Sequence, residues 1–186
     1  PGKEEAAYFL NDLENLGSSP LWFPPSFRRP YETEETANAN VVLRAEVLEK
    51  IRSSSNPLLI VSTPEALAER VIRRSELGKN TLSIQKSEKL DAAFMSQVLQ
   101  EFGFRRVDYV NEPGEYSLRG GIADIWSYSS DLPYRVEFFG SEVESIRLFD
   151  PVDQLSKREL RNASIVPNIS SPLQVTERQS IFEFLG

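Results

Sequence analysis

The chain of 186 residues contains no cysteine and no histidine. These two absences exclude a disulfide framework, a zinc site built on Cys or His, and acid–base catalysis by histidine. The sequence also lacks any apolar run near the ~20 residues of a membrane helix, and no secretory signal opens it. Because cysteine-poor chains suit a reducing compartment, we expect a cytoplasmic protein.

A phosphate-binding P-loop is also missing. The nearest fragments, Gly2-Lys3 and Gly78-Lys79-Asn80-Thr81, lack the first glycine and the hydroxyl residue directly after lysine that the motif requires. The carboxylates Asp124 and Glu137 lie inside strand patterns with no other metal-ligand residues near them in the sequence. Nothing in the sequence singles out a magnesium site made of carboxylates alone. We therefore expect no catalytic residue, no cofactor and no metal site in this chain.

The composition is that of an ordinary globular protein. Apolar residues make up 40% and charged residues 26% of the chain, enough for one or two domains with a sizeable core. The net charge of −7 argues against strong non-specific binding of nucleic acid. The chain opens on Pro1 rather than methionine, so we expect a fragment excised from a longer protein.

The first part of the chain alternates helical and strand patterns. Such alternation is typical of a parallel α/β sheet, so residues 1–79 are expected to form a partial α/β domain. The expected helices cover residues 4–16, 38–52 and a segment from Pro64 through Ile72 that Ser62 or Thr63 caps; the expected strands are 21–23 and 58–61, with a loop over 24–36. The spacing in the second helix places on one side Val41, Arg44, Val47, Leu48 and Ile51.

The pattern changes near residues 78–80. A strand over 81–85 and a helix over 88–102 precede β-rich runs separated by Gly, Pro, Ser and Asp, which indicates an antiparallel meander over residues 103–151. The helix is expected to bury Leu90, Phe94, Val98 and Phe102. We expect a small α+β domain over residues 80–155. A polar tail, a short strand over 165–167 and a helix over 176–184 would follow.

The strand Tyr134–Phe139 has an unusual outward face. Side chains alternate along a strand, so Arg135, Glu137 and Phe139 share the face opposite the core. Arg135 and Phe139 are about 13 Å apart along it, and both residue types dominate protein–protein hot spots. Two plainer interpretations remain open: Phe139 is buried under a helix, or Arg135 pairs with an acid such as Glu144.

Arg119-Gly120-Gly121 precedes the next strand pattern. Adjacent glycines permit an anion-binding nest, but we favour a turn that uses glycine for a positive φ.

Two segments carry a family resemblance. EPGEYSLRGGIADIW and PYRVEFFGSEVESIRLFDP resemble the UvrB-homology module of the bacterial transcription-repair coupling factor (Mfd). LWFPPSFRRPYE and LLIVSTPEALAERV extend the resemblance more weakly. It implies a partial parallel-sheet domain like the first domain of UvrB over residues 1–79, an inserted α+β domain over 80–155, and a return to the first domain over 156–186.

The resemblance also implies a function. In the family this module has no ATPase activity and binds UvrA through the inserted domain, so that UvrA is recruited to lesion-stalled RNA polymerase for nucleotide excision repair. ATP and Mg²⁺ serve motor domains elsewhere in the parent protein. Other parts of the parent contact RNA polymerase and DNA, and its C-terminal domain masks the UvrA-binding surface.

The family's UvrA-contacting positions fall on four residues of this chain. Arg119 is the arginine of the RGG run, Arg135 that of the PYR strand, and Phe139 the second phenylalanine of EFF. Arg106 aligns with a further UvrA-contacting arginine of UvrB.

An alternative interpretation is a DNA-binding module in which a cluster of arginines tracks phosphates; the cluster consists of Arg105, Arg106, Arg119, Arg135 and Arg147. The cluster is interleaved with acids, which favours a protein-binding surface. UvrB also carries an aromatic-rich DNA-binding hairpin, whereas the corresponding residues 30–45 have one aromatic, Tyr31. A steep dependence of affinity on salt would indicate DNA binding.

Overall fold

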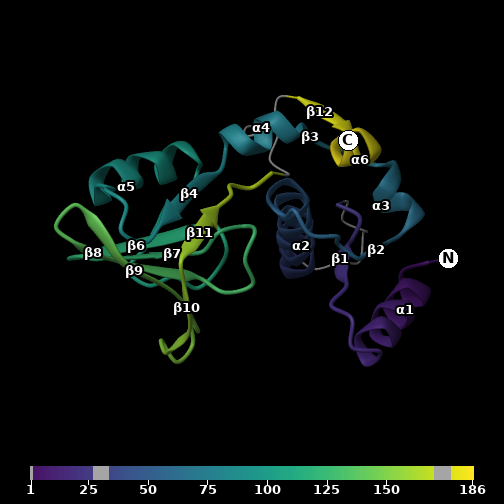
Figure 1. Ribbon diagram of the computed structural model, residues 1–186, viewed down its shortest axis with the longest axis horizontal. Helices are drawn as coiled ribbons and strands as arrows, with labels where there is room; N and C mark the ends of the chain where they lie inside the picture. Colours follow the sequence, from purple (N-terminus) through teal and green to yellow (C-terminus); the bar gives the residue numbers. More distant parts are fainter. Residues whose placement is uncertain (1, 27–33, 170–176) are drawn as a thin grey trace. The chain divides into compact units, whose positions relative to one another are not determined.

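The computed structural model describes residues 2–26, 34–169 and 177–186. The chain forms two compact units (Figure 1). The central unit contains residues 80–168, and the terminal unit contains residues 1–79 and 169–186. The sequence places the end of the inserted domain earlier, at residue 155, and the assignment of these segments to UvrB-like domains stays a prediction.

The terminal unit combines short helices with two small sheets. β1 and β2 are parallel, and β3 pairs with β12 in the antiparallel sense. Within the described part of the chain, the predicted parallel sheet is therefore limited to two strands. The elements are α1 (Lys3–Asn15), β1 (Leu21–Phe23), α2 (Glu34–Ser53), β2 (Ile60–Ser62), α3 (Pro64–Ala68), β3 (Arg70–Ile72), α4 (Arg74–Lys79), β12 (Arg178–Ser180) and α6 (Ile181–Leu185).

Helix α2 buries the face that its apolar spacing predicts. Val41, Val47 and Leu48 are buried, and Arg44 on the same face is only 4% exposed. The Arg44 guanidinium donates to the carbonyl of Pro24 at 2.7 Å and lies 3.2 Å from a carboxylate oxygen of Glu69. A charge that is buried in a small core needs such partners.

The predicted helix from Pro64 through Ile72 is wrong beyond its first turn. Thr63 caps α3 as expected, because its hydroxyl accepts from the backbone N–H of Ala66. The helix ends at Ala68, and Glu69 is extended so that its carboxylate can accept from the N–H of Ser26. Residues 70–72 then form β3, which pairs with a strand that sequence spacing alone does not reveal.

Two further boundaries differ from the prediction. Leu58 and Leu59, expected in a covered strand, are 37% and 45% exposed, and β2 begins at Ile60. The expected C-terminal helix is shorter, since residues 178–180 are a strand. Residues 27–33 of the expected loop, and residues before 177 of that helix, lie outside the described part. None of the described helices is both long and apolar enough to span a bilayer.

The central unit is built on a six-stranded sheet in the order β10-β9-β8-β7-β6-β5. Its neighbours are antiparallel except the parallel pair β5–β6, so the antiparallel meander is confirmed. The elements are β4 (Leu82–Gln85), α5 (Ala92–Glu101), β5 (Arg105–Arg106), β6 (Glu115–Arg119), β7 (Ile122–Ile125), β8 (Tyr134–Phe139), β9 (Glu142–Phe149), β10 (Ser156–Leu160) and β11 (Asn162–Ile165).

The segment after Pro151 is more ordered than its polar composition predicts. Residues 156–160 add β10 to the edge of the sheet, and β11 pairs with β4. The short strand expected over 165–167 therefore lies earlier, at Asn162–Ile165. Polar residues suit β10 because an edge strand needs no covering on both faces.

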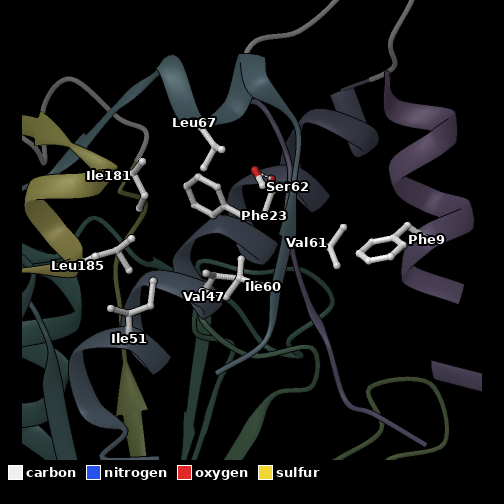
Figure 2. Close-up of a pocket in the computed structure, with 10 residues that line it drawn as sticks. All are labelled: Phe9, Phe23, Val47, Ile51, Ile60, Val61, Ser62, Leu67, Ile181 and Leu185. Carbon is white, nitrogen blue, oxygen red and sulfur yellow. Dashed lines mark hydrogen bonds between the residues drawn. The ribbon is translucent and has the colours of Figure 1, made fainter. Parts of the chain in front are cut away.

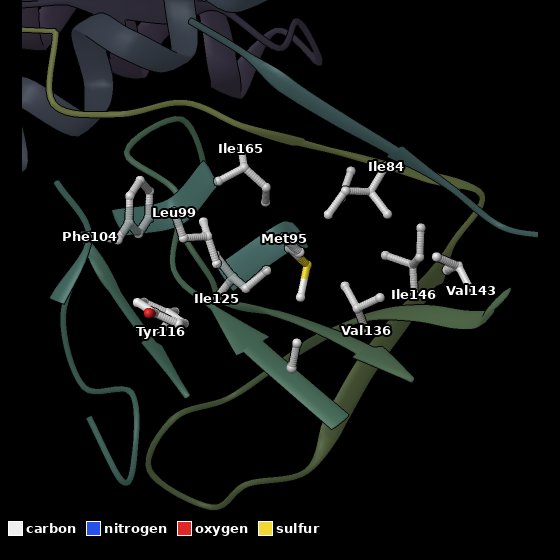
Figure 3. Close-up of a cluster of buried hydrophobic side chains, with 12 residues drawn as sticks. Ile84, Met95, Leu99, Phe104, Tyr116, Ile125, Val136, Val143, Ile146 and Ile165 are labelled. Carbon is white, nitrogen blue, oxygen red and sulfur yellow. The ribbon is translucent and has the colours of Figure 1, made fainter. Parts of the chain in front are cut away.

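One face of the sheet carries the core of the central unit (Figure 3). Met95 and Leu99 of α5 pack against it together with Ile84 of β4 and Ile165 of β11. The sheet contributes inward-facing side chains from alternate positions: Tyr116, Ala123, Ile125, Val136, Val143 and Ile146. Helix α5 therefore covers one face and leaves the other uncovered by it.

The predicted buried row of α5 is confirmed only in part, since Leu90 and Phe102 are partly buried against the core. Phe94 is 54% exposed, whereas Met95 and Leu99 are fully buried. The helix begins only at Ala92, because Asp91 caps it by accepting from the N–H of Ala93 at 2.9 Å. Leu90 lies before the helix and pairs its N–H with the carbonyl of Ser141, so it does not set the helical register. Gly103 follows the helix end as predicted.

Candidate protein-binding surface

The second face of the sheet, here called the outer face, carries three of the four predicted site residues: Arg119, Arg135 and Phe139. Inward positions of β6–β8 are taken by core side chains such as Leu118, Ala123 and Val136, so their strand neighbours point outward. The strand register arranges these in two cross-strand rows: Ser117, Asp124, Arg135 and Arg147, and beside them Arg119, Ile122, Glu137 and Ser145.

Two glycine turns place Arg119 and Phe139 at the same end of the sheet. Gly120 and Gly140 have φ of 58° and 63° and open two-residue hairpin loops after β6 and β8, a conformation that favours glycine. The favoured interpretation of the RGG run as a turn is thus confirmed. β6 and β8 run in the same direction on either side of β7, about 10 Å apart. The β6–β7 and β8–β9 loops therefore lie at the same end of the sheet.

Asp124 on β7 links the two predicted arginines. Its carboxylate accepts from Arg135 Nε at 2.7 Å and Nη2 at 2.9 Å, and from Arg119 Nη2 at 2.5 Å. The aspartate is only 2% exposed. A buried carboxylate with three charged donors is fully compensated, so Asp124 fixes both guanidinium groups in place.

Arg135 is held more tightly than a flexible surface anchor. Its side chain is 16% exposed, and its guanidinium lies 4.2 Å from the ring centroid of Phe149. Nη1 and Nη2 also donate to the carbonyl and the side-chain oxygen of Gln154 at 3.3 and 3.0 Å. The hydrogen bond to Asp124 raises the pKa of Arg135, and partial burial opposes it. Most of its donors are therefore used within the chain.

Arg119 is the more accessible arginine. Its side chain is 39% exposed, and its guanidinium stacks 4.7 Å from the ring centroid of Tyr109. Nη1 also donates to the carbonyl of Asp108 at 3.1 Å. Stacking fixes the plane of the guanidinium while its remaining edge faces solvent, an arrangement suited to a carboxylate on a partner.

Phe139 is 79% exposed. The interpretation that a helix covers it is wrong. The interpretation that Arg135 pairs with an acid on a neighbouring strand is confirmed, but the acid is Asp124 on β7 and not Glu144. Large apolar side chains that stand in solvent beside ordered charges are typical of interaction sites.

Arg106, the fourth predicted residue, is exposed on β5, the edge strand that lies beside β6. It lines a shallow hollow together with Tyr109 and Arg119. In the part of the chain that the structure describes, its guanidinium has no ion-pair partner.

The other arginines of the cluster are neutralised by acids. Arg105 pairs with Glu112 at 2.7 Å and Glu115 at 2.6 Å, and Arg147 pairs with Glu137 at 2.5 Å. Acids spaced among the arginines lower the positive potential that a phosphate track needs, so the geometry favours a protein partner over DNA.

Asp124 and Gln154 are functional candidates that the site prediction missed. The sequence shows only that Asp124 lies inside a strand pattern; its position directly opposite Arg135 follows from the pairing of β7 with β8. Nothing in the sequence indicates a role for Gln154, because a polar residue in a turn has no preferred contact. Its role depends on how the chain folds back after β9.

An apolar pocket of about 400 Å³ lies in the terminal unit, between α1, α2, β2 and α6 (Figure 2). Phe9, Val47, Ile60 and Leu185 are among its lining residues. The hydroxyl of Ser62 donates to the carbonyl of Phe23 at 2.8 Å, so it is already used. A pocket without several polar groups directed into it has few hydrogen-bonding partners that could orient a ligand.

No group of acidic side chains suitable for a metal ion occurs among residues 2–26, 34–169 and 177–186.

Comparison with known proteins agrees with this architecture. The model of the UvrB interaction domain matches residues 82–170, which cover nearly all of the central unit. The transcription-repair-coupling factor of Bacillus subtilis is 37% identical over 137 residues, 73% of this chain, and that of Escherichia coli is 31% identical over 138 residues, 74% of it. The Haemophilus influenzae protein is 27% identical over 168 residues, 90% of the chain.

These matches span only 12% of the first two relatives and 15% of the third. The matched domain is an interaction domain, and such a domain acts by binding another protein. The chain is homologous to the region of the transcription-repair coupling factor (Mfd) that contains the UvrB interaction domain.

Proposed function

We propose that the outer face of the central unit binds UvrA, with Phe139 and Arg119 as direct contacts near one end of the sheet and Arg135 held in place in the row beside Arg119. Arg106 contributes from the hollow beside Arg119. The observation that carries the proposal is the 79% exposed Phe139 on the strand face of Arg135, next to two arginines held by one buried aspartate.

Each contact has a distinct physical role. Phe139 would fill an apolar pocket on the partner, and truncation of such an anchor costs on the order of 2 kcal/mol. Arg119 would donate to a partner carboxylate through its free edge. Because Asp124 and Tyr109 already order Arg119, little side-chain entropy remains to be lost on binding.

Homology with the coupling factors supports a wider role for this surface. The chain acts without catalysis and without its own cofactor, as a cytoplasmic recruitment module that brings UvrA to lesion-stalled RNA polymerase in transcription-coupled nucleotide excision repair. ATP, Mg²⁺, polymerase and DNA engage other parts of the longer protein, whose C-terminal domain masks this surface at rest.

Calorimetric titration of UvrA into the chain tests the proposal. Phe139→Ala should weaken binding at least about tenfold. Phe94→Ala is a matched control, because Phe94 is also exposed, at 54%, but belongs to α5 on the opposite face of the sheet. Equal losses from both variants, or none from either, would overturn the assignment to the outer face.

A salt series separates the DNA alternative. Phosphate neutralisation would lower log affinity by roughly 0.9 per contact for each log unit of salt. We expect no tight DNA binding at physiological salt. Tight, salt-sensitive DNA binding that is indifferent to Phe139→Ala would reject the proposed function.

A further inference from the structure

The turn between β9 and β10, residues 150–155, is unusually ordered for an exposed segment. Asp150 N–H donates to the carbonyl of Leu155 at 3.0 Å, and Gln154 N–H donates to the carbonyl of Asp150 at 2.9 Å. The carboxylates of Asp150 and Asp153 accept from the N–H groups of Val152 and Leu155 at 2.9 and 2.8 Å. These bonds fix the backbone of the whole turn.

Gln154 adopts a conformation that side chains seldom take. Its φ is 61°, in the left-handed region, which is sterically strained for a residue with a Cβ. In this conformation both its carbonyl and its side-chain oxygen accept from Arg135, at 3.3 and 3.0 Å. Its side-chain nitrogen donates to the carbonyl of Pro151 at 2.7 Å. The strained residue therefore ties the turn to the outer face.

The same turn presents two aliphatic side chains to solvent. Val152 is 92% exposed and Leu155 is 62% exposed. Exposed apolar groups on a rigid backbone lose little conformational entropy when a partner covers them. A turn that served only to connect two strands would need neither these side chains nor the strained link to Arg135.

We propose that residues 150–155 form a second contact region of the UvrA-binding surface. Val152 and Leu155 contact an apolar patch of the partner, and Gln154 is a positioning residue that holds Arg135. This inference rests on the proposed function and adds to it an aliphatic contact at the end of the sheet away from Phe139. The partner surface must then offer apolar groups at two places, with acidic groups between them opposite the arginines.

The direct contacts are tested by Val152→Ser and Leu155→Ser in the calorimetric titration with UvrA. Each should weaken binding about fivefold to tenfold without changing the melting temperature, because the replaced side chains are exposed. Leu16→Ser is the matched control, since Leu16 is 81% exposed in the terminal unit. Its affinity should equal that of the parent.

The positioning role is tested by Gln154→Gly. Glycine accepts the positive φ but removes the side-chain oxygen that binds Arg135. We expect about a fivefold loss of UvrA affinity in the parent background and no further loss in an Arg135→Ala background. Val152→Ser should keep its full effect in that background, because it acts directly.

A partner-free readout completes the test. Because the guanidinium of Arg135 is hydrogen-bonded to both Asp124 and Gln154, its Nη protons should give separate NMR signals. Gln154→Gly should merge these signals through faster rotation of the guanidinium.

Two outcomes decide between the proposals. If UvrA binds and Phe139→Ala weakens that binding, while the Val152, Leu155 and Gln154 variants bind like the parent, the turn is not a contact region. If the parent itself does not bind UvrA, the proposed function fails instead.

Discussion

Asp124 and Arg135 lie directly opposite each other on β7 and β8, joined by two hydrogen bonds of 2.7 and 2.9 Å. The pair is more than a surface salt bridge, because Asp124 is almost fully buried and also holds Arg119. One carboxylate thus sets the geometry of two arginines proposed to face the partner. Its contribution should appear both in stability and in binding.

Asp124→Asn is predicted to weaken UvrA binding about tenfold. Asparagine is nearly isosteric, but its amide nitrogen would face a guanidinium donor and leave charged groups uncompensated. Calorimetry measures the affinity, and circular dichroism checks that the sheet remains folded. The unfolding free energy should fall by about 2 kcal/mol. Unchanged affinity in a folded variant would mean that the ordering of Arg119 and Arg135 does not matter.

Gly114→Ala should destabilise the central unit by about 3 kcal/mol. Gly114 has a φ of 89°, and an added Cβ would lie 2.5 Å from the hydroxyl oxygen of Tyr128, so both strain and a clash oppose the change. Gly120→Ala is the control, with a φ of 58° and open space around it. It should cost only about 1 kcal/mol in urea denaturation. Equal costs would show that the contact with Tyr128 relaxes freely.

Glu69→Gln should lower the stability of the terminal unit by about 2 kcal/mol, because it leaves the buried Arg44 without a countercharge. Burial lowers the pKa of Arg44, and the negative charge of Glu69 opposes this shift. The guanidinium nevertheless stays charged at neutral pH. Glu46→Gln removes the exposed pair with Lys50 and should cost less than about 0.5 kcal/mol. Thermal unfolding distinguishes the two; similar small losses would contradict the buried-pair account.

The turn at residues 150–155 should loosen in acid. The N–H of Leu155, and after it Lys157, hold the pKa of Asp153 below its ordinary value of 3.8. A lowered folded-state pKa means that this contribution is complete above the ordinary value and is lost as the pH falls through the lowered one. An NMR titration of the Leu155 amide should therefore show no change down to about pH 4. A midpoint above 3.8 would contradict the contact.

The sequence predicts those parts of the fold that depend on local pattern. Alternation along Tyr134–Phe139 places Val136 in the core and Phe139 outside it, and the spacing in α2 correctly includes Arg44 in its buried face. Patterns fail where distant pairing decides. The spacing of Val71 and Ile72 predicts that they end a helix, but they form a strand because they pair with β12.

The candidate site divides in the same way. Arg119, Arg135 and Phe139 stand out by motif and alternation, whereas the roles of Asp124 and Gln154 depend on which strands meet and how the chain turns back. Exposure also decides between residues of one type. Phe94 and Phe139 both fit apolar patterns, and only the fold shows that both are exposed, on opposite faces of the sheet.

UvrA is proposed to bind the outer face of the sheet and not the face that α5 covers. Methyl NMR with cross-saturation from unlabelled UvrA tests it most directly. Ile122 lies between Arg119 and Glu137 on the outer face and is 36% exposed, while Ala93 is exposed on α5. The account predicts that the Ile122 methyl signal loses intensity and the Ala93 signal does not; the reverse pattern would contradict it.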